Sequence, residues 1–139
     1  TIMESFSYFD VGGSNSGKKA EAFYHAFCLG LLITARDFKY EVKSNHEGGT
    51  DRYNIKIMPT TQTTTSFGVI IEFKVAGKAD DLQDMAFAGL NQIREKEYRA
   101  ACPPELTLLC EYGIAFKGKD SWVVGEKWEK DLEGLWRKL

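Results

Sequence analysis

The sequence has little of what marks membrane, secreted and metal-finger proteins. No apolar run approaches the roughly 18 residues that a membrane-spanning helix needs, and the first residues lack the basic and apolar stretches of a signal peptide. The three cysteines are odd in number and have no C-x-x-C spacing, so a zinc or redox site of that kind is not indicated. We therefore expect a soluble, cytoplasmic protein with reduced cysteines and no membrane partner.

An excess of positive charge is also missing. The formal net charge is -2 and the pI is about 5.7, so any contact with nucleic acid must come from a local basic patch. What is present is an ordinary globular composition, with 43% hydrophobic and 27% charged residues in a chain of 139. This length suits one domain with a core of its own, and we expect residues 1–139 to form a single domain.

The spacing of apolar residues predicts alternating helices and strands. Apolar residues recur every three or four positions over residues 18–35 and 79–100, which is typical of amphipathic helices. Strands are predicted at "SFSYF", "FKYEVKSN", "RYNIKIM", "FGVIIEFKV", "LTLLCEYGIAF" and "SWVV". A last apolar stripe predicts a helix over about residues 126–139, through Trp128, Leu132, Leu135, Trp136 and Leu139.

The order of these elements predicts a mixed α/β sheet. Three strands joined by short turns are most simply an antiparallel meander, and a strand that follows a long helix can join the sheet by a crossover. The second and third strands of the meander are "DRYNIKI" and "GVIIEFKV", joined by the polar run "PTTQTTTS". Antiparallel pairing through that turn would place the middle of one strand beside the middle of the other.

Polar residues share one face of these two strands. Residues two apart on a strand point the same way, so Arg52, Asn54 and Lys56 lie on one side of the second strand. Glu72 and Lys74 lie on one side of the third strand, which is otherwise apolar. Burying a carboxylate and an ammonium is unfavourable unless they pair or bind something. The simple interpretation is a mutual ion pair, and the other is a polar site that also includes Asn54.

An acid followed by E-x-K on the next strand is the pattern of the PD-(D/E)xK nuclease superfamily. Five segments, "EAFYHAFCLGLL", "VKSNHEGGTDRYNIKIMP", "GVIIEFKV", "AGLNQIREKEY" and "YGIAFKGKD", resemble one branch of it. That branch is the small nuclease-like domain found C-terminal to AAA-type ATPase domains in bacterial proteins. The resemblance covers about residues 5–124 and implies a restriction-endonuclease-like core, with a four-stranded mixed sheet flanked by α-helices. An extra short strand and the C-terminal helix complete the predicted fold.

The resemblance also assigns roles to individual residues. It implies that Glu21 is the helix-borne acid, that Glu72 and Lys74 are the E-x-K pair, and that Gln92 and Tyr98 are polar positions of the following helix. The family pattern Gly-Arg-Tyr-Asp ends in the first acid of the motif, whereas this chain has Asn54 there. The predicted catalytic residues are Glu21, Asn54, Glu72, Lys74 and Gln92; the predicted metal ligands are Asn54, Glu72 and Glu21; and the predicted nucleic-acid contacts are Arg52, Lys56 and Tyr98.

These residue types suit metal-assisted hydrolysis. Mg2+ prefers carboxylate, carbonyl and water oxygens, and Mn2+ can take its place. A bound metal activates water and polarises a phosphodiester, while a nearby lysine stabilises developing charge. Asparagine keeps a carbonyl oxygen but lacks the negative charge of aspartate. We therefore predict a metal-dependent nuclease-fold domain that acts on nucleic acid, with DNA as the expected partner, and that is impaired by Asn54.

Several alternatives stay open. The chain is either an impaired nuclease or a catalytically inactive module of the same fold that binds nucleic acid or a protein partner. A structural oligomerisation domain is the third possibility, in which Glu72 and Lys74 are only an ion pair. Asp51 is a poor substitute for the missing acid because it lies on the opposite strand face, and Glu47 is a further ligand or a loop charge. The resemblance is compatible with an ATPase domain in a longer parent chain and with a homodimer.

Overall fold

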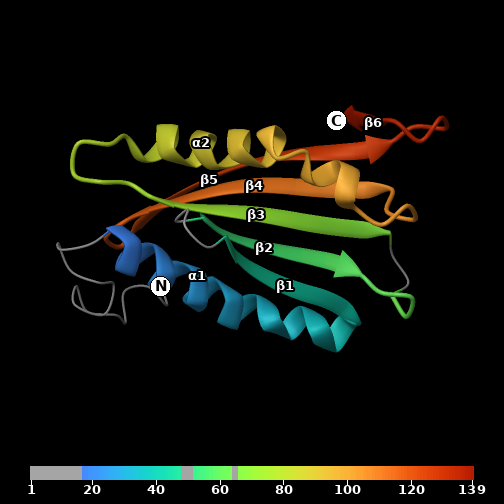
Figure 1. The fold of residues 1–139 in the computed structure, drawn as a ribbon, viewed down its shortest axis with the longest axis horizontal. Helices are drawn as coiled ribbons and strands as arrows, with labels where there is room; N and C mark the ends of the chain where they lie inside the picture. The colour runs from blue at the N-terminus through green and yellow to red at the C-terminus, as the bar shows by residue number, and fades with distance from the viewer. Residues whose placement is uncertain (1–16, 48–51, 64–65) are drawn as a thin grey trace.

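The fold consists of a twisted sheet with a helix against each face (Figure 1). The computed structural model describes residues 17–47, 52–63 and 66–139, and within these ranges the side chains of all but residues 17–23, 27, 45–47 and 52–53. The elements are α1 (Gly17–Leu32), η2 (Ile33–Phe38), β1 (Tyr40–Glu47), β2 (Arg52–Pro59), β3 (Phe67–Val75), α2 (Leu82–Glu95), η3 (Tyr98–Ala101), β4 (Leu108–Lys117), β5 (Asp120–Lys130) and β6 (Trp136–Lys138). The strand predicted at residues 5–9 lies outside the described residues.

The six strands form one mixed sheet in the order β1-β2-β3-β4-β5-β6. Neighbouring strands are antiparallel except β3 and β4, which run parallel. Helix α2 lies between β3 and β4 in the sequence and provides the crossover that a parallel pair needs. The predictions of a mixed α/β sheet, of the β1–β3 meander and of the crossover are confirmed.

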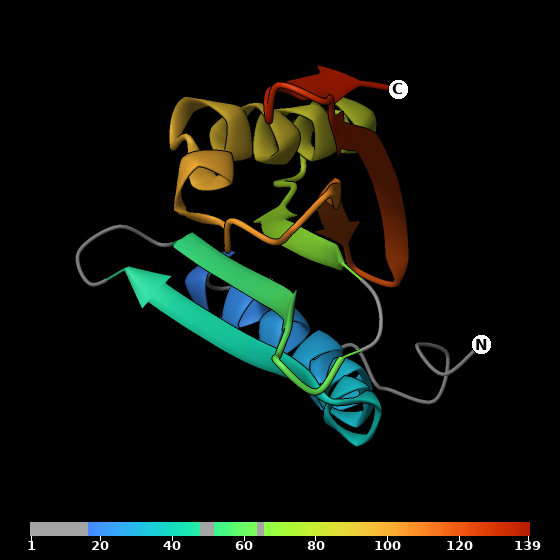
Figure 2. The same cartoon turned by 90° about the vertical axis from the view of Figure 1, so that its right-hand side faces the viewer.

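Two hydrophobic cores lie on opposite faces of the sheet. Tyr24 of α1 packs with Ile55, Phe73 and Phe116 on one face, and its ring stacks on that of Phe116 with the centroids 4.1 Å apart. The other face packs against α2, with Ile70, Leu90, Ile93, Leu106 and Leu109 at its centre. Figure 2 shows the two helices on either side of the strands. Alternate residues of β2 and β3 therefore point to opposite sides of the sheet, which we call the α1 face and the α2 face after the helix that each side packs against.

Helix α2 approaches the sheet closely because of a glycine in β4. A Cβ atom at Gly113 would lie 2.6 Å from the backbone nitrogen of Leu90, and closer still to the carbonyl oxygen of Ala86. Gly89 lies directly over the same point, where a Cβ would be 3.4 Å from the carbonyl oxygen of Glu72. Asp81 starts the helix by accepting a hydrogen bond from the backbone nitrogen of Asp84 at 2.9 Å. The helix thus lies with one face directly over β3 and β4.

The prediction of a helix over residues 126–139 is wrong. Strand β5 continues to Lys130 in register with β4, and residues 131–135 turn the chain into β6. Asp131 Oδ1 accepts hydrogen bonds from the backbone nitrogens of Glu133 and Leu135, and Gly134 takes a positive φ of 80°, so both residues favour a turn. The predicted four-stranded sheet with an extra short strand is accordingly a six-stranded sheet that ends in a hairpin.

The helix boundaries also differ from those expected. Helix α1 ends at Leu32, where a 3-10 turn begins, and α2 stops at Glu95 rather than near residue 100. Glu97 has a positive φ of 50°, which breaks the helical path before η3. In the described ranges, every helix falls short of the length and apolarity required to cross a bilayer.

Candidate active site

Asn54 and Glu72 face each other across the β2–β3 pair. The two residues are directly opposite in the antiparallel register, and their side chains point to the α2 face, because Ile55 and Ile71 point to the α1 core. Asn54 is 1% exposed and Glu72 is fully buried. The predicted placement of Asn54 beside Glu72 is confirmed.

Gln92 of α2 connects the glutamate to Lys74. Its Nε2 atom donates a hydrogen bond of 2.9 Å to Glu72 Oε1, and its Oε1 accepts one of 2.5 Å from Lys74 Nζ. The Gln92 amide thus donates to the carboxylate with its nitrogen and accepts from the ammonium with its oxygen. Gln92 lies one turn after Gly89, so the close approach of α2 to the sheet brings this amide to Glu72.

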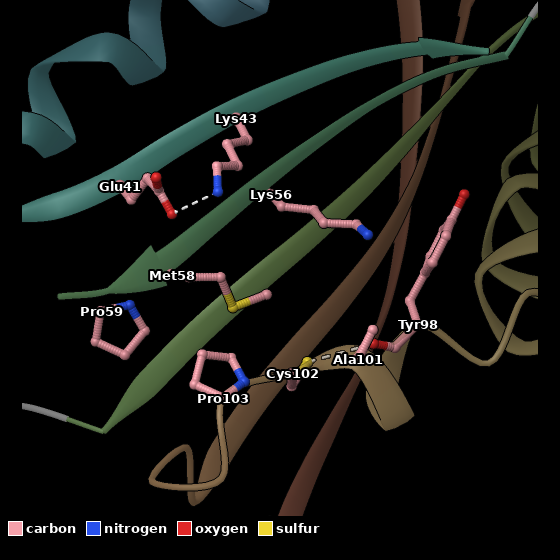
Figure 3. A pocket seen from close by; sticks show the side chains of 9 residues that line it. All are labelled: Glu41, Lys43, Lys56, Met58, Pro59, Tyr98, Ala101, Cys102 and Pro103. Carbon is pink, nitrogen blue, oxygen red and sulfur yellow. Dashed lines mark hydrogen bonds and ion pairs between the residues drawn. The ribbon is translucent and has the colours of Figure 1, made fainter.

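Tyr98 completes the cluster on the side of β2, and Lys56 lies over its ring. Asn54 Nδ2 donates a hydrogen bond of 3.3 Å to Tyr98 Oη, and Lys56 Nζ lies 4.1 Å from the centroid of the Tyr98 ring (Figure 3). The other amide atom of Asn54, Oδ1, is buried and has no hydrogen-bond partner among the described residues. We refer to Asn54, Glu72, Lys74, Gln92 and Tyr98 as the Asn54 cluster.

The side chains of two predicted site residues lie outside the described ones. Glu21 belongs to α1, the helix on the other face of the sheet, and its side chain lies outside the described ones. Arg52 is the first residue of β2, and its side chain also lies outside them. The same holds for Glu47 at the end of β1, while Asp51 is outside the described ranges altogether. The structure therefore assembles the cluster from β2, β3, α2 and η3.

The oxygen donors of the cluster suit a hard divalent cation in type. A buried carboxylate on Glu72 and the unpartnered carbonyl oxygen of Asn54 come from directly opposite positions, and Mg2+ prefers such oxygens. Among the described residues, no group of three or more His, Cys, Asp or Glu side chains gathers in one place. In this part of the cluster, Glu72 supplies the negative charge and Asn54 supplies a neutral oxygen.

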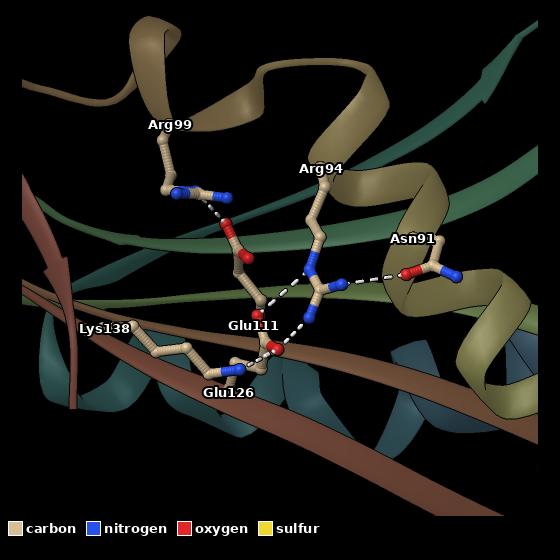
Figure 4. A network of polar contacts seen from close by, with 6 residues as sticks. All are labelled: Asn91, Arg94, Arg99, Glu111, Glu126 and Lys138. Atoms are coloured by element: carbon tan, nitrogen blue, oxygen red, sulfur yellow. Dashed lines mark hydrogen bonds and ion pairs between the residues drawn. The ribbon is translucent and has the colours of Figure 1, made fainter.

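A second buried acid, Glu111 of β4, lies on the same face and was not predicted. It is fully buried and accepts a hydrogen bond of 2.8 Å from Arg99 Nε (Figure 4). The Arg99 guanidinium stacks on the Trp128 ring at 3.6 Å. Burial raises the pKa of Glu111, although Arg99 and the nearby Trp128 indole oppose that shift. The signal was present in the sequence, because "LTLLCEYGIAF" carries one acid in an apolar strand, as "GVIIEFKV" does.

A further ionic contact ties the C-terminal hairpin to α2. Glu126 of β5 pairs with Arg94 of α2 and with Lys138 of β6 (Figure 4). Arg94 also donates a hydrogen bond of 3.0 Å to Asn91 Oδ1. Because η3 directly follows α2, these contacts and the Glu111–Arg99 pair hold the turn that carries Tyr98 against the sheet.

The amino-acid sequence matches a model of a known family. A sequence model described as the PD-(D/E)XK nuclease superfamily matches residues 19–126, which is most of the chain and includes every residue of the Asn54 cluster. The chain therefore belongs to the PD-(D/E)XK nuclease superfamily, and its fold is a nuclease fold. A search of the curated proteins found no match.

Proposed function

We propose that this protein is a metal-dependent nuclease domain that hydrolyses phosphodiester bonds of nucleic acid, with activity reduced by Asn54. The observation that carries the proposal is the pairing of Asn54 with Glu72, joined by Gln92 to Lys74. A carboxylate, an opposite oxygen donor and a nearby ammonium are the groups that metal-assisted hydrolysis uses. Family membership makes this chemistry the expected one for the fold.

Within the cluster, Glu72 and the Asn54 carbonyl oxygen would hold Mg2+ or Mn2+. The resemblance implies Glu21 as a further ligand, but Glu21 belongs to α1, which lies on the other face of the sheet, so the proposed metal site rests on Asn54 and Glu72. The metal, when bound, would polarise the phosphodiester and lower the pKa of a coordinated water. Lys74 is held beside Glu72 by the Gln92 amide, where its ammonium would stabilise negative charge on the phosphate. Gln92 acts as a positioning residue in this account.

Asn54 reduces activity by removing a charge. An amide oxygen is a neutral ligand, so a site with Glu72 alone attracts a divalent cation less than one with two carboxylates. The shape of the site is retained, because asparagine and aspartate differ only in the terminal atom. We infer that a single substitution at position 54 restores an active enzyme.

We also propose the features that the family resemblance implies for the substrate, the origin, the location and the domain context. They are DNA as the substrate, a bacterial origin, a cytoplasmic location and a place among the domains found C-terminal to AAA-type ATPase domains. An ATPase domain in a longer parent chain and a homodimer are part of the same proposal. A chromatographic comparison of the parent protein with this domain tests the last two.

A second candidate function has its own support. Asn54 and Glu72 are almost fully buried, and Glu72 is the one carboxylate described in the cluster. A nuclease fold that has lost its metal site but keeps a binding surface would show this arrangement. The second candidate is therefore a catalytically inactive module that binds nucleic acid or a protein partner.

A cleavage assay on the original chain and on Asn54→Asp separates the two candidates. With Mg2+ and labelled DNA, we expect Asn54→Asp to cleave at least about 10-fold faster than the original chain, because a metal site gains a charged ligand. Gln83→Glu, the same amide-to-carboxylate change at an exposed position on α2, is the matched control and should not change the rate. Equal rates for Asn54→Asp and the original chain would show that position 54 is not at the metal. Binding without cleavage by either protein favours the inactive module.

A further inference from the structure

A recess opens beside the Asn54 cluster, between β1, β2 and the chain around η3 (Figure 3). Its volume is about 270 Å³, and we call it the flanking pocket. Its lining includes Lys43, Lys56, Met58, Tyr98, Ala101 and Pro103. This volume lies just below the range of about 300–1,000 Å³ that is typical of small-ligand pockets, so the flanking pocket has room for one nucleotide at most and none for a duplex.

The flanking pocket shares a wall with the candidate active site. Tyr98 contacts Asn54 through its hydroxyl group and Lys56 through its ring, and it lines the pocket as well. Lys56 is two residues after Asn54 on the same face of β2, which separates their backbones by roughly 7 Å. A strand of nucleic acid that places a phosphodiester at the Asn54 cluster therefore places the next nucleotide at the flanking pocket.

The lining of the flanking pocket matches the parts of a nucleotide. The ammonium groups of Lys43 and Lys56 suit a phosphate, and the apolar side chains of Met58 and Pro103 offer a surface to the base. Glu41 pairs with Lys43 at 3.1 Å, so its carboxylate offsets part of the Lys43 charge and offers an acceptor to the polar edge of a base. The charge of the lining side chains changes farther along the sheet.

A neighbouring recess of about 720 Å³ continues past Glu41 and Pro103 and has a different lining. It adds Glu105 and the hydroxyl groups of Thr60, Thr61 and Thr63. None of the described residues that line this second recess is basic. Positive charge is thus confined to the end nearest the Asn54 cluster, which favours one bound nucleotide over a long bound strand.

We propose that the flanking pocket binds one unpaired nucleotide next to the bond that the Asn54 cluster acts on, so that the substrate is single-stranded or has a single-stranded end. This inference rests on the proposed function. A base inside a duplex is stacked and paired, and it enters a recess of this kind only after it has left the stack. The protein therefore discriminates by strandedness.

The test is a binding measurement without cleavage, by fluorescence anisotropy in EDTA with a short fluorescein-labelled single strand of DNA and with the same strand in a blunt duplex. The single strand is expected to bind more tightly. Ala101→Trp fills the pocket from an exposed position on η3 and is expected to weaken single-strand binding at least about 10-fold, the scale of one lost base contact. Ala100→Trp, the exposed neighbour that does not line the pocket, is the matched control and should bind as the original chain does.

A second pair of variants covers the case in which tryptophan disturbs η3. Lys43→Gln removes an exposed ammonium of the pocket and is expected to reduce the slope of log affinity against log salt by about 0.7. The control Lys127→Gln removes an ammonium group from β5 on the α1 face of the sheet, because the neighbouring Trp128 points to the α2 face. It should leave single-strand binding unchanged.

The outcomes also separate this inference from the proposed function. Equal binding of single strand and duplex, or no effect of both Ala101→Trp and Lys43→Gln, overturns the flanking-pocket inference even when Asn54→Asp cleaves DNA. Absence of binding by the original chain together with absence of cleavage by Asn54→Asp overturns the proposed function too.

Discussion

Introducing an aspartate at position 54 places two carboxylates side by side in a buried position. Asn54 and Glu72 are directly opposite in the β2–β3 ladder, and both are almost completely shielded from water. The substitution Asn54→Asp changes no side-chain volume but adds a negative charge. Without a metal, the two carboxylates repel each other, and this repulsion should lower the free energy of unfolding by a measurable amount.

The magnitude follows from the register. Directly opposite residues have Cβ atoms roughly 5 Å apart, and two unit charges at that separation repel by about 3 kcal/mol at an effective dielectric constant of 20. The ammonium of Lys74, linked to Glu72 through Gln92, offsets part of this. We expect Asn54→Asp to lower the free energy of unfolding by about 2 kcal/mol at pH 7 in EDTA, which corresponds to a fall of about 8 °C in Tm for a domain of this size.

The assay is thermal unfolding with and without Mg2+. A metal that binds the two carboxylates of the folded protein stabilises it by about 2.7 kcal/mol at 100 times its Kd, so Mg2+ should return the Tm of Asn54→Asp to that of the original chain or above. The original chain, with one carboxylate fewer, should respond less. Gln83→Glu makes the same amide-to-carboxylate change at an exposed position of α2 and is expected to stay within about 0.5 kcal/mol in both buffers.

A Tm for Asn54→Asp in EDTA that equals that of the original chain would refute the charge argument. A fall in Tm that Mg2+ and Mn2+ both fail to reverse would keep the repulsion but remove the metal from this position. Either result is independent of any measurement of cleavage.

Three further substitutions test the contacts around the site. Gly113→Ala puts a Cβ against the backbone of α2, and we expect it to lower the free energy of unfolding, measured in urea, by at least about 3 kcal/mol. The control Gly30→Ala lies in α1, where a Cβ would have nothing within 4 Å, and it should raise the free energy of unfolding by about 0.5–1 kcal/mol. Gln92→Leu removes the amide between the Glu72 carboxylate and Lys74 and should cost about 1–3 kcal/mol, while Gln83→Leu at an exposed position of the same helix should cost less. Burial raises the pKa of Glu111 above 4.5, so protonation of this carboxyl stabilises the folded state at low pH, and that stabilisation is lost as the pH rises through the folded pKa. The stability of Glu111→Gln relative to the original chain should therefore increase between pH 4.5 and pH 7. A difference in stability that does not change with pH would contradict the raised pKa.

The core of the site was predictable because it depends on strand geometry. Alternation fixed which side Asn54, Glu72 and Lys74 face, and a short polar connection between two strands implied their antiparallel pairing. Gln92 could be assigned to the site only through the family resemblance. Its contact with Glu72 depends on how closely α2 approaches the sheet, which Gly113 decides from a distant part of the chain.

The C-terminal hairpin was not predictable from apolar spacing alone. Trp128 and Trp136 fit a helical stripe, but in the structure both pack toward the α2 core from neighbouring strands. Long-range pairing of β5 with β4 outweighs local periodicity there. Asp131 and Gly134 were the local signals for a turn, since one accepts backbone hydrogen bonds and the other adopts a positive φ.

The position of Tyr98 depends on local backbone geometry that the sequence pattern does not contain. Helix α2 ends at Glu95, and Glu97 then takes a left-handed conformation, which directs η3 back over the sheet. The Tyr98 hydroxyl group consequently reaches Asn54. A helix continued to residue 100, as the spacing suggested, would have carried the ring along another path.

A metal between residue 54 and Glu72 would be seen in a crystal structure of Asn54→Asp soaked in Mn2+, with anomalous scattering recorded. We expect one strong anomalous peak between the carboxylates of residue 54 and Glu72, on the α2 face of the sheet, and a weaker peak or none at the same place in the original chain. Manganese bound elsewhere, or an empty position between these two side chains in Asn54→Asp, would contradict this expectation.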